Sequence, residues 1–177
     1  MKRIIFSVLC SFVFIAIHAQ TETKDCKYSF ATTLGTGISM SSPSYTPFTW
    51  QVLGYYNLTD RWSVGAGTGL SFYEEMLIPV FGDARFQIGR TRKFTPFAEF
   101  GIGYSLAPSS DVNGGFFMNP SFGVEYALKN KMKIQFAVGY EFQEFDRLKS
   151  YTDNYFESEF EEHLSHHSIS FKLGLRF

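Results

Sequence analysis

The last stretch of the sequence, HSISFKLGLRF at residues 167–177, alternates between two kinds of side chain. Every second residue from Ile169 to Phe177 is apolar, whereas the residues between them are serine, lysine, glycine and arginine. A period of two is typical of a β-strand whose two faces meet different surroundings. The sequence therefore predicts that the chain ends in a strand with one apolar and one polar face.

Seven segments upstream repeat this alternation, and together they predict an all-β, eight-stranded antiparallel up-and-down barrel. They are Tyr28–Ser39, Phe48–Asn57, Trp62–Tyr73, Ile78–Gly89, Phe94–Leu106, Phe116–Leu128 and Met132–Phe145, followed by His167–Phe177. Most match the about 9–11 residues that a tilted strand needs to cross a membrane, and exceed the about 5–6 residues of a typical globular strand. The segments therefore favour a transmembrane barrel.

The connections alternate in length. Tight turns are predicted at 57–61, 90–93 and 129–131, and longer loops elsewhere, except for the short connection at 73–77. The longest predicted loop runs from Asp146 to Ser165. Short periplasmic turns and long outer loops are the asymmetry of transmembrane barrels. We therefore expect both chain ends on the periplasmic side.

The polar faces are small and rich in glycine, as in Ser63, Gly65, Gly67, Gly69 and Ser71. Such faces suit a narrow interior, so we expect the apolar faces to point outward to lipid. The predicted interior also carries a charge network of four acids and four bases: Asp83, Arg85, Glu99, Glu125, Lys133, Glu141, Lys172 and Arg176. We expect paired charges to plug the lumen, with contact to water at the rims as the alternative for some of them.

Aromatic residues gather near the segment ends, which predicts a belt at each membrane interface. Pro79, Pro96 and Pro120 cannot donate to a strand ladder, so we expect them at rims or bulges.

The N-terminus predicts export. Residues 1–19 combine Lys2 and Arg3, an apolar run and Ala19 before a cleavage point, which indicates a signal peptide. Residues 20–27 are expected to form a short N-terminal lead, and residues 28–177 are expected to form the barrel domain. The full chain has a net charge of −1, and losing Lys2 and Arg3 makes it more acidic, which argues against a nucleic-acid partner. Cys26 is the sole cysteine after cleavage, so no intrachain disulfide is expected.

On these segments and on the terminal strand, the chain resembles the small eight-stranded outer-membrane barrels of the OmpA/OmpX type. In that family a final strand ending in phenylalanine is recognised by the barrel-assembly machinery. The resemblance implies this assembly signal for Phe171, Leu173, Leu175 and Phe177. It also implies location in a bacterial outer membrane, with outer-membrane lipid and lipopolysaccharide as surroundings. We expect a monomer.

Three functions remain open: a structural or surface-interaction barrel whose outer loops bind an extracellular ligand, a narrow channel or small-solute transporter, and a lipid-modifying enzyme. We favour the first, with a plugged lumen. His166 and Ser168 are similar to a pair in eight-stranded lipid A deacylases, but no acid follows them, so we expect no enzyme and no cofactor. A soluble lipocalin-like barrel is the remaining alternative.

The acidic loop at 146–165 offers possible metal ligands. They are Asp153, Glu157, Glu159, Glu161, Glu162, His163, His166 and His167. Their spacing fits no calcium-binding loop, so we interpret the segment as a solvated acidic loop and expect no metal there.

Overall fold

The computed structural model describes residues 27–41, 46–73, 75–89, 93–109, 112–128, 132–153 and 156–177. At 148–161 it describes the backbone alone. The predicted signal peptide at 1–19 and all but the last residue of the lead at 20–27 lie outside these ranges.

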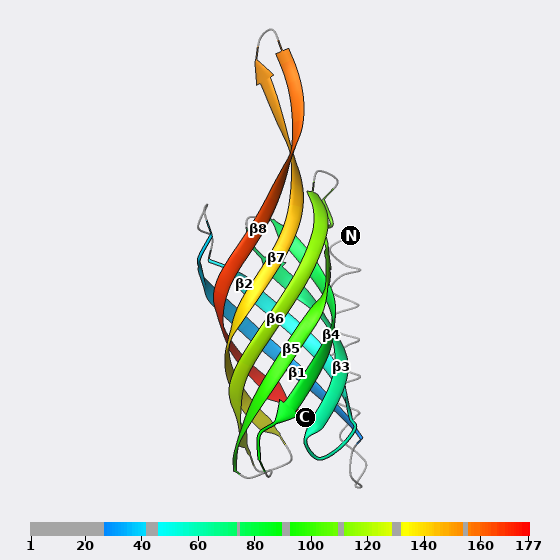
Figure 1. Cartoon of the computed structure of the whole chain (residues 1–177), viewed down its shortest axis with the longest axis vertical. Coiled ribbons are helices and arrows are strands. Elements are labelled where there is room, and N and C mark those ends of the chain that lie inside the picture. The colour runs from blue at the N-terminus through cyan, green and yellow to red at the C-terminus, as the bar shows by residue number, and fades with distance from the viewer. Residues whose placement is uncertain are drawn as a thin grey trace, which may run out of the picture.

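Eight antiparallel strands close into one barrel in simple up-and-down order (Figure 1), which confirms the predicted fold class. The strands are β1 (Tyr28–Ser39), β2 (Phe48–Asn57), β3 (Trp62–Phe72), β4 (Met76–Gln87), β5 (Phe94–Leu106), β6 (Val112–Ala127), β7 (Lys133–Asp153) and β8 (Phe156–Arg176). Closure comes from pairing of the first strand with the last, from Ala31↔Arg176 to Ser39↔Ser168. Closure leaves no open edge along the barrel wall.

The two ends of the barrel differ. We call the end where β1 begins and β8 ends the turn end, and the opposite end, where β7 and β8 project, the hairpin end (Figure 1). No helix in the described part of the chain is long and apolar enough to cross a membrane.

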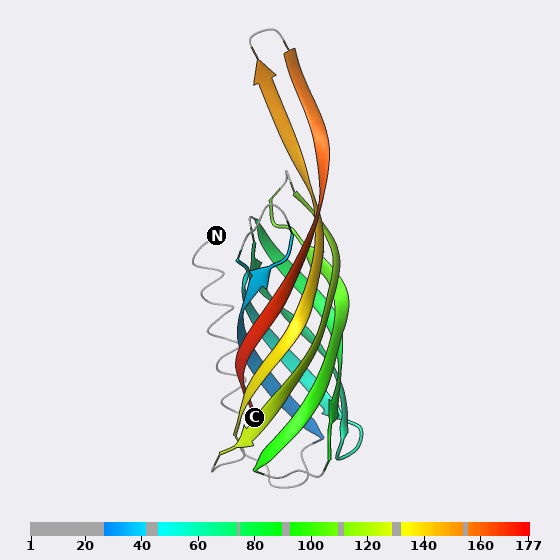
Figure 2. The ribbon, with the colours of Figure 1, turned by 60° about the vertical axis from the view of Figure 1, so that its left-hand side comes forward.

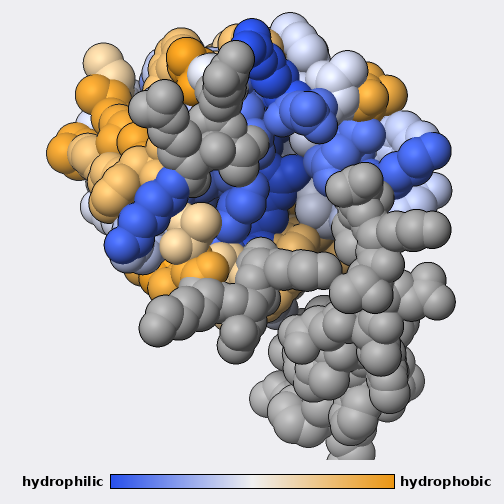
Figure 3. All heavy atoms as spheres, turned by 90° about the horizontal axis from the view of Figure 1, so that it is seen from below, coloured by the Kyte–Doolittle hydropathy of each residue, from blue (hydrophilic) through white to orange (hydrophobic). Residues whose placement is uncertain are grey.

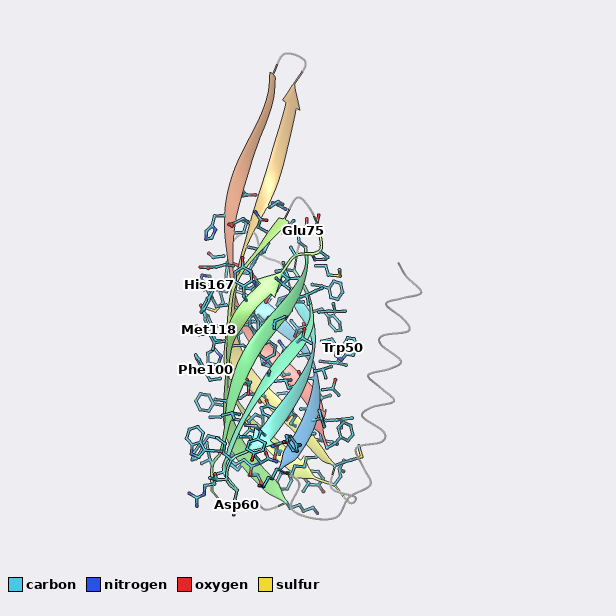
Figure 4. All side chains as sticks on the ribbon, turned by 90° about the vertical axis from the view of Figure 1, so that its right-hand side faces the viewer. Trp50, Asp60, Glu75, Phe100, Met118 and His167 are labelled. Carbon is cyan, nitrogen blue, oxygen red and sulfur yellow. The ribbon has the colours of Figure 1, made fainter. Side chains whose placement is uncertain are left out.

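The two faces of each strand are separated as the alternation predicts. In β1, Ser29, Ala31 and Thr33 are buried, whereas Tyr28 and Leu34 are 67% and 52% exposed. Large apolar side chains cover the outside, and Trp50 and Phe100 project from the wall (Figure 4). Seen from the turn end, hydrophilic residues gather in the middle, with hydrophobic residues along much of the rim (Figure 3). Phe100 and Phe136, which a soluble barrel would hold inside, are both exposed.

Cross-strand aromatic pairs line both ends of the outer surface. At the turn end, ring centroids lie 5.3 Å apart in Tyr28–Tyr56 and 4.8 Å apart in Phe94–Tyr126. At the hairpin end, Phe116 and Phe142 lie 6.0 Å apart. Aromatic residues on neighbouring strands thus build the two belts.

The predicted loop from Asp146 to Ser165 was wrong. Instead, β7 and β8 continue as a paired ribbon, from Asp146↔His163 to Asp153↔Phe156. This hairpin extends well beyond the other strands (Figure 2). The sequence gives a weak strand signal there because apolar residues do not recur at every second position between 146 and 165.

The three prolines differ in position. Pro79 and Pro96 lie near strand ends, as expected. Pro120 does not: it lies within β6, paired with Phe100, and the register shift of β6 falls between Gly114 and Phe117 instead. The β6–β7 ladder passes from Met118↔Phe142 to Ser121↔Gly139, so it loses contacts beside Pro120 without changing register.

Candidate functional site

The interior of the barrel at the turn end holds a compact group of charged side chains, which we call the turn-end ion cluster. Its members come from five strands: Arg85, Glu99, Glu125, Lys133, Lys172 and Arg176. They are brought together because each occupies an inward position of its strand. Of the eight charged residues predicted for the lumen, Asp83 and Glu141 lie outside this set of ion pairs.

Arg85 is the centre of the cluster. Its Nη1 lies 2.8 Å from Glu99 Oε2 and 2.9 Å from Gln135 Oε1, and its Nη2 lies 2.5 Å from Glu125 Oε1. The side chain is fully buried. A planar guanidinium can serve several acceptors at fixed angles, which a lysine ammonium cannot.

Glu125 receives three cations. Besides Arg85, its carboxylate accepts from Lys133 Nζ at 3.1 Å and from Arg176 Nη1 at 3.1 Å. Arg176 also donates to Ser29 and Asn57, so it links β8 to β1, β2 and β6. Isolated buried charges are costly, whereas charges that share several hydrogen bonds are tolerated.

Aromatic residues that the sequence analysis did not single out complete this end. The Arg85 guanidinium lies 3.5 Å from the centroid of the Phe97 ring. A side chain at Gly123 would place its Cβ 2.5 Å from that ring, so the glycine makes room for it. Tyr55 donates to Asp83 at 2.9 Å and to Glu99 at 3.2 Å. Phe97 and Tyr55 occupy inward positions, and that alternation was the signal that could have identified them.

An apolar layer follows further inside the barrel. Ala31, Leu53, Tyr55, Phe81 and Phe117 form one buried cluster, in which the Phe81 and Phe117 rings lie 5.2 Å apart. Along β4, Phe81 is the next inward residue after Asp83 and Arg85, so the layer lies directly beyond the charged groups. Ions and rings together fill the lumen on this side.

Glu141 lies toward the hairpin end, in different surroundings. Its carboxylate accepts hydrogen bonds from the Tyr73 hydroxyl and from Asn119 Nδ2, the latter at 2.7 Å. Tyr73 follows β3, outside the strands, and burial together with the nearby Glu141 raises the pKa of its hydroxyl well above the ordinary value. The hydroxyl therefore stays protonated and remains a donor.

Apolar and aromatic side chains close the lumen above Glu141. Leu77, Val112 and Phe145 form a buried cluster against which Tyr73, Ala107 and Leu164 pack. The His166 ring stacks on Phe145 and on Tyr73, with ring centroids 5.4 Å apart in each pair. We call this group the hairpin-end cap.

His166 and Ser168, the pair similar to that of lipid A deacylases, are both buried inside the barrel. His166 Nδ1 lies 3.2 Å from Ser41 Oγ. The pair is thus turned away from the outer apolar surface, where an acyl chain of a membrane lipid would lie.

The candidate metal ligands of the hairpin are only partly described. The side chains of Asp153, Glu157, Glu159 and Glu161 lie outside the described residues. Nearby, Arg147 pairs with Glu162 at 2.9 Å, and His163 contacts Asp146. Within the described side chains, no three His, Cys, Asp or Glu residues come together as a metal site would require.

The residues of the expected assembly signal lie on the outer face of β8 and just after it. Leu173 and Phe177 are exposed, and Phe171 and Leu175 are half-buried. Phe177 exchanges two backbone hydrogen bonds with Phe30 of β1. The C-terminal residue thus takes part in closing the barrel.

Neither a protein-family model nor a curated protein sequence matches the chain. Among solved structures, neisserial surface protein A is similar, with a TM-score of 0.58 and 12% identity, over 85% of this chain and 96% of that chain. The outer membrane protein AlkL in lipid bilayers is similar with a TM-score of 0.56 and 12% identity, over 89% of this chain and 92% of that chain. The chain therefore shares the fold of small eight-stranded outer-membrane barrels.

Proposed function

We propose that this chain is an integral protein of a bacterial outer membrane, exported through a cleaved signal peptide, with a closed lumen and a structural or surface-interaction role. The observation that supports this most is the sidedness of the wall. Large apolar side chains such as Phe122 and Leu173, 68% and 59% exposed, cover the outside, while ions lie within. Soluble monomers rarely expose apolar patches of more than a few hundred Å², so lipid is the natural environment of this surface.

The test is the behaviour of the full chain in cells. We expect it in the outer-membrane fraction, resistant to extraction by carbonate and high salt, and requiring detergent to leave the membrane. Recovery in the soluble periplasmic fraction would refute the proposal.

The closed lumen has its own test. The turn-end ion cluster, the apolar layer and the hairpin-end cap each fill the interior at a different depth. We therefore expect no large, stable conductance from the purified barrel in planar lipid bilayers. Regular channel openings would instead favour the narrow-channel alternative.

A surface-interaction role is supported by the β7–β8 hairpin, which projects past the other strands (Figure 2). Replacing residues 148–161 by a short turn should leave the barrel folded, because the wall below keeps its pairing from Lys133↔Arg176 to Arg147↔Glu162. We expect the shortened variant to reach the membrane at normal levels. Cells that carry it should adhere less than cells that carry the unaltered chain. Unchanged adhesion of cells carrying the shortened variant would rule out this hairpin as the binding element.

Assembly is proposed to depend on the terminal strand. Phe177→Ala should lower the amount of barrel in the outer membrane, while Leu128→Ala, an exposed apolar change beside a turn, serves as the matched control. Equal membrane levels of the two variants would contradict the assigned signal.

We also propose that the protein has no lipid-modifying activity, because His166 and Ser168 are buried within the barrel. Mass spectrometry of lipid A from cells with and without the chain should give the same spectrum. The proposal would be overturned if lipid A lost an acyl chain in cells that carry the unaltered chain and kept it in cells that carry His166→Ala.

A further inference from the structure

Polar side chains form two neighbouring rows on the inner wall between β6 and β8. Asn119, Glu141 and Ser168 make the first row: Asn119 bonds to Glu141, and Glu141 pairs with Ser168 in the register of β7 and β8. The second row contains Ser121 and Ser170, both paired with Gly139. Glu141 and Ser168 are directly paired, which places their Cβ atoms about 4.5–5.5 Å apart. Ser121 and Ser170 flank Gly139, which has no side chain to separate them.

Several oxygens of these rows have no hydrogen-bond partner. They are Asn119 Oδ1 and the hydroxyl oxygens of Ser121, Ser168 and Ser170. None of these four residues is more than 3% exposed. Buried polar atoms in native proteins are nearly always satisfied, so four unsatisfied oxygens on one patch of wall point to a small polar ligand, and all four can act as acceptors.

The charge of Glu141 points the same way. The residue is 1% exposed, and its two hydrogen-bond donors, Tyr73 and Asn119, are neutral. No ion pair of the described residues includes Glu141. The inward cation on the adjoining strand, Lys172, acts on Glu141 only at longer range, and its Nζ lies 3.9 Å from Glu99 Oε1. A buried carboxylate is costly unless a positive charge or a proton compensates it.

We infer that this patch binds a single monovalent cation of the sodium class, with Glu141 as its charged ligand and the unpaired oxygens of Asn119, Ser121, Ser168 and Ser170 as neutral ligands. Hard cations prefer oxygen ligands, and one carboxylate cancels one positive charge. Tyr73 of the hairpin-end cap donates to Glu141, and the five proposed ligands are at most 3% exposed, so the site has little contact with water. The inference needs the barrel fold alone and goes beyond the proposed location and role.

Thermal unfolding of the full barrel in zwitterionic detergent tests the inference. Sodium chloride replaces choline chloride at constant ionic strength, so that the screening of charges by salt is unchanged. Binding of one ion to the folded state should raise the unfolding temperature by about 3–5 °C for each tenfold rise in sodium above the dissociation constant. An unfolding temperature that is the same in sodium and in choline would overturn the site, as would a response to calcium but not to sodium.

Two variants tie the effect to these residues. Glu141→Gln should abolish the sodium dependence, because the amide keeps the shape but not the charge. Ser63→Ala is the matched control, since Ser63 is also buried and inward but lies at the turn end, beside Asn57 and Arg176. It should lower the unfolding temperature equally in both salts.

A different explanation is that Glu141 simply carries a proton. In that case stability would change with pH and not with sodium, and the inference would be wrong. If Glu141→Gln does not fold, the double variant Ser168→Ala with Ser170→Ala, together with calorimetric titration of sodium into the unaltered barrel, decides. One binding event that weakens in the double variant supports the site, and absence of heat refutes it.

Discussion

Two buried glutamates at opposite ends of the lumen have opposite surroundings. Glu125 accepts from Arg85, Arg176 and Lys133, so its charge is more than matched by cations of the chain itself. Glu141 accepts from two neutral donors. The turn end is therefore a self-sufficient electrostatic closure, whereas the hairpin end has a charge that the described ion pairs leave unmatched. Equal burial of the same residue type does not imply the same role.

The largest expected effect is that of Glu125→Gln. Removing this carboxylate takes a shared anion from the buried Arg85 and Arg176, and breaking buried ion pairs typically costs about 3–5 kcal/mol. We expect a loss of that size in the free energy of unfolding, measured by urea titration of the barrel in detergent.

Glu141→Gln is the matched variant for this comparison. In choline buffer it should change stability by less than about 1 kcal/mol, because the amide oxygen can still accept from Asn119 while the amide NH2 can donate to the Tyr73 hydroxyl oxygen. Similar losses from the two substitutions would show that the two ends do not differ in the way proposed.

Arg85→Lys sharpens the account of the turn end. A lysine keeps the positive charge but cannot bond at once to Glu99, Glu125 and Gln135, nor lie flat on Phe97 as the guanidinium does. We expect a loss of about 1–3 kcal/mol from unmade hydrogen bonds to charged groups. If the variant were as stable as the original, charge alone would account for the cluster, and the geometry of Arg85 would be unimportant.

Tyr73→Phe examines the hairpin end. The substitution removes the hydroxyl that donates to Glu141 but keeps the ring that stacks on His166. The expected cost is about 1 kcal/mol, typical of one hydrogen bond. Because the carboxylate loses a competing donor, sodium should bind more tightly, which calorimetry would detect. A weaker sodium response would mean that the tyrosine hydroxyl is itself a ligand.

The fold could be predicted from the sequence because a barrel in lipid repeats its two-faced pattern in every strand. Segments such as Phe94–Leu106 and Phe48–Asn57 have the observed bounds for this reason. The ribbon at 146–165 lacks the regular alternation of apolar and polar residues, so its pairing was missed. The same alternation predicted that each charged residue faces inward, but it did not predict which residue each one pairs with.

Partners depend on how far neighbouring strands are staggered, and that stagger is a property of the closed barrel. Sequence alone therefore grouped Glu141 with Glu125 in one predicted network, although the structure surrounds the two with different groups. Likewise, Tyr73 donates a hydrogen bond to Glu141, which is distant in the sequence, and no local sequence pattern predicts this contact.

The smallest effect is expected for Lys133→Gln. Lys133 contacts the same carboxylate as Arg85 and Arg176, but its side chain is 25% exposed, so water screens the interaction. We expect a loss of less than about 1 kcal/mol, since Glu125 keeps its two arginines. The urea titration used for Glu125→Gln measures it. A loss as large as that from Glu125→Gln would mean that Glu125 needs all three cations. The turn end would then have no surplus of positive charge, and its contrast with Glu141 would be weaker than the ion pairs indicate.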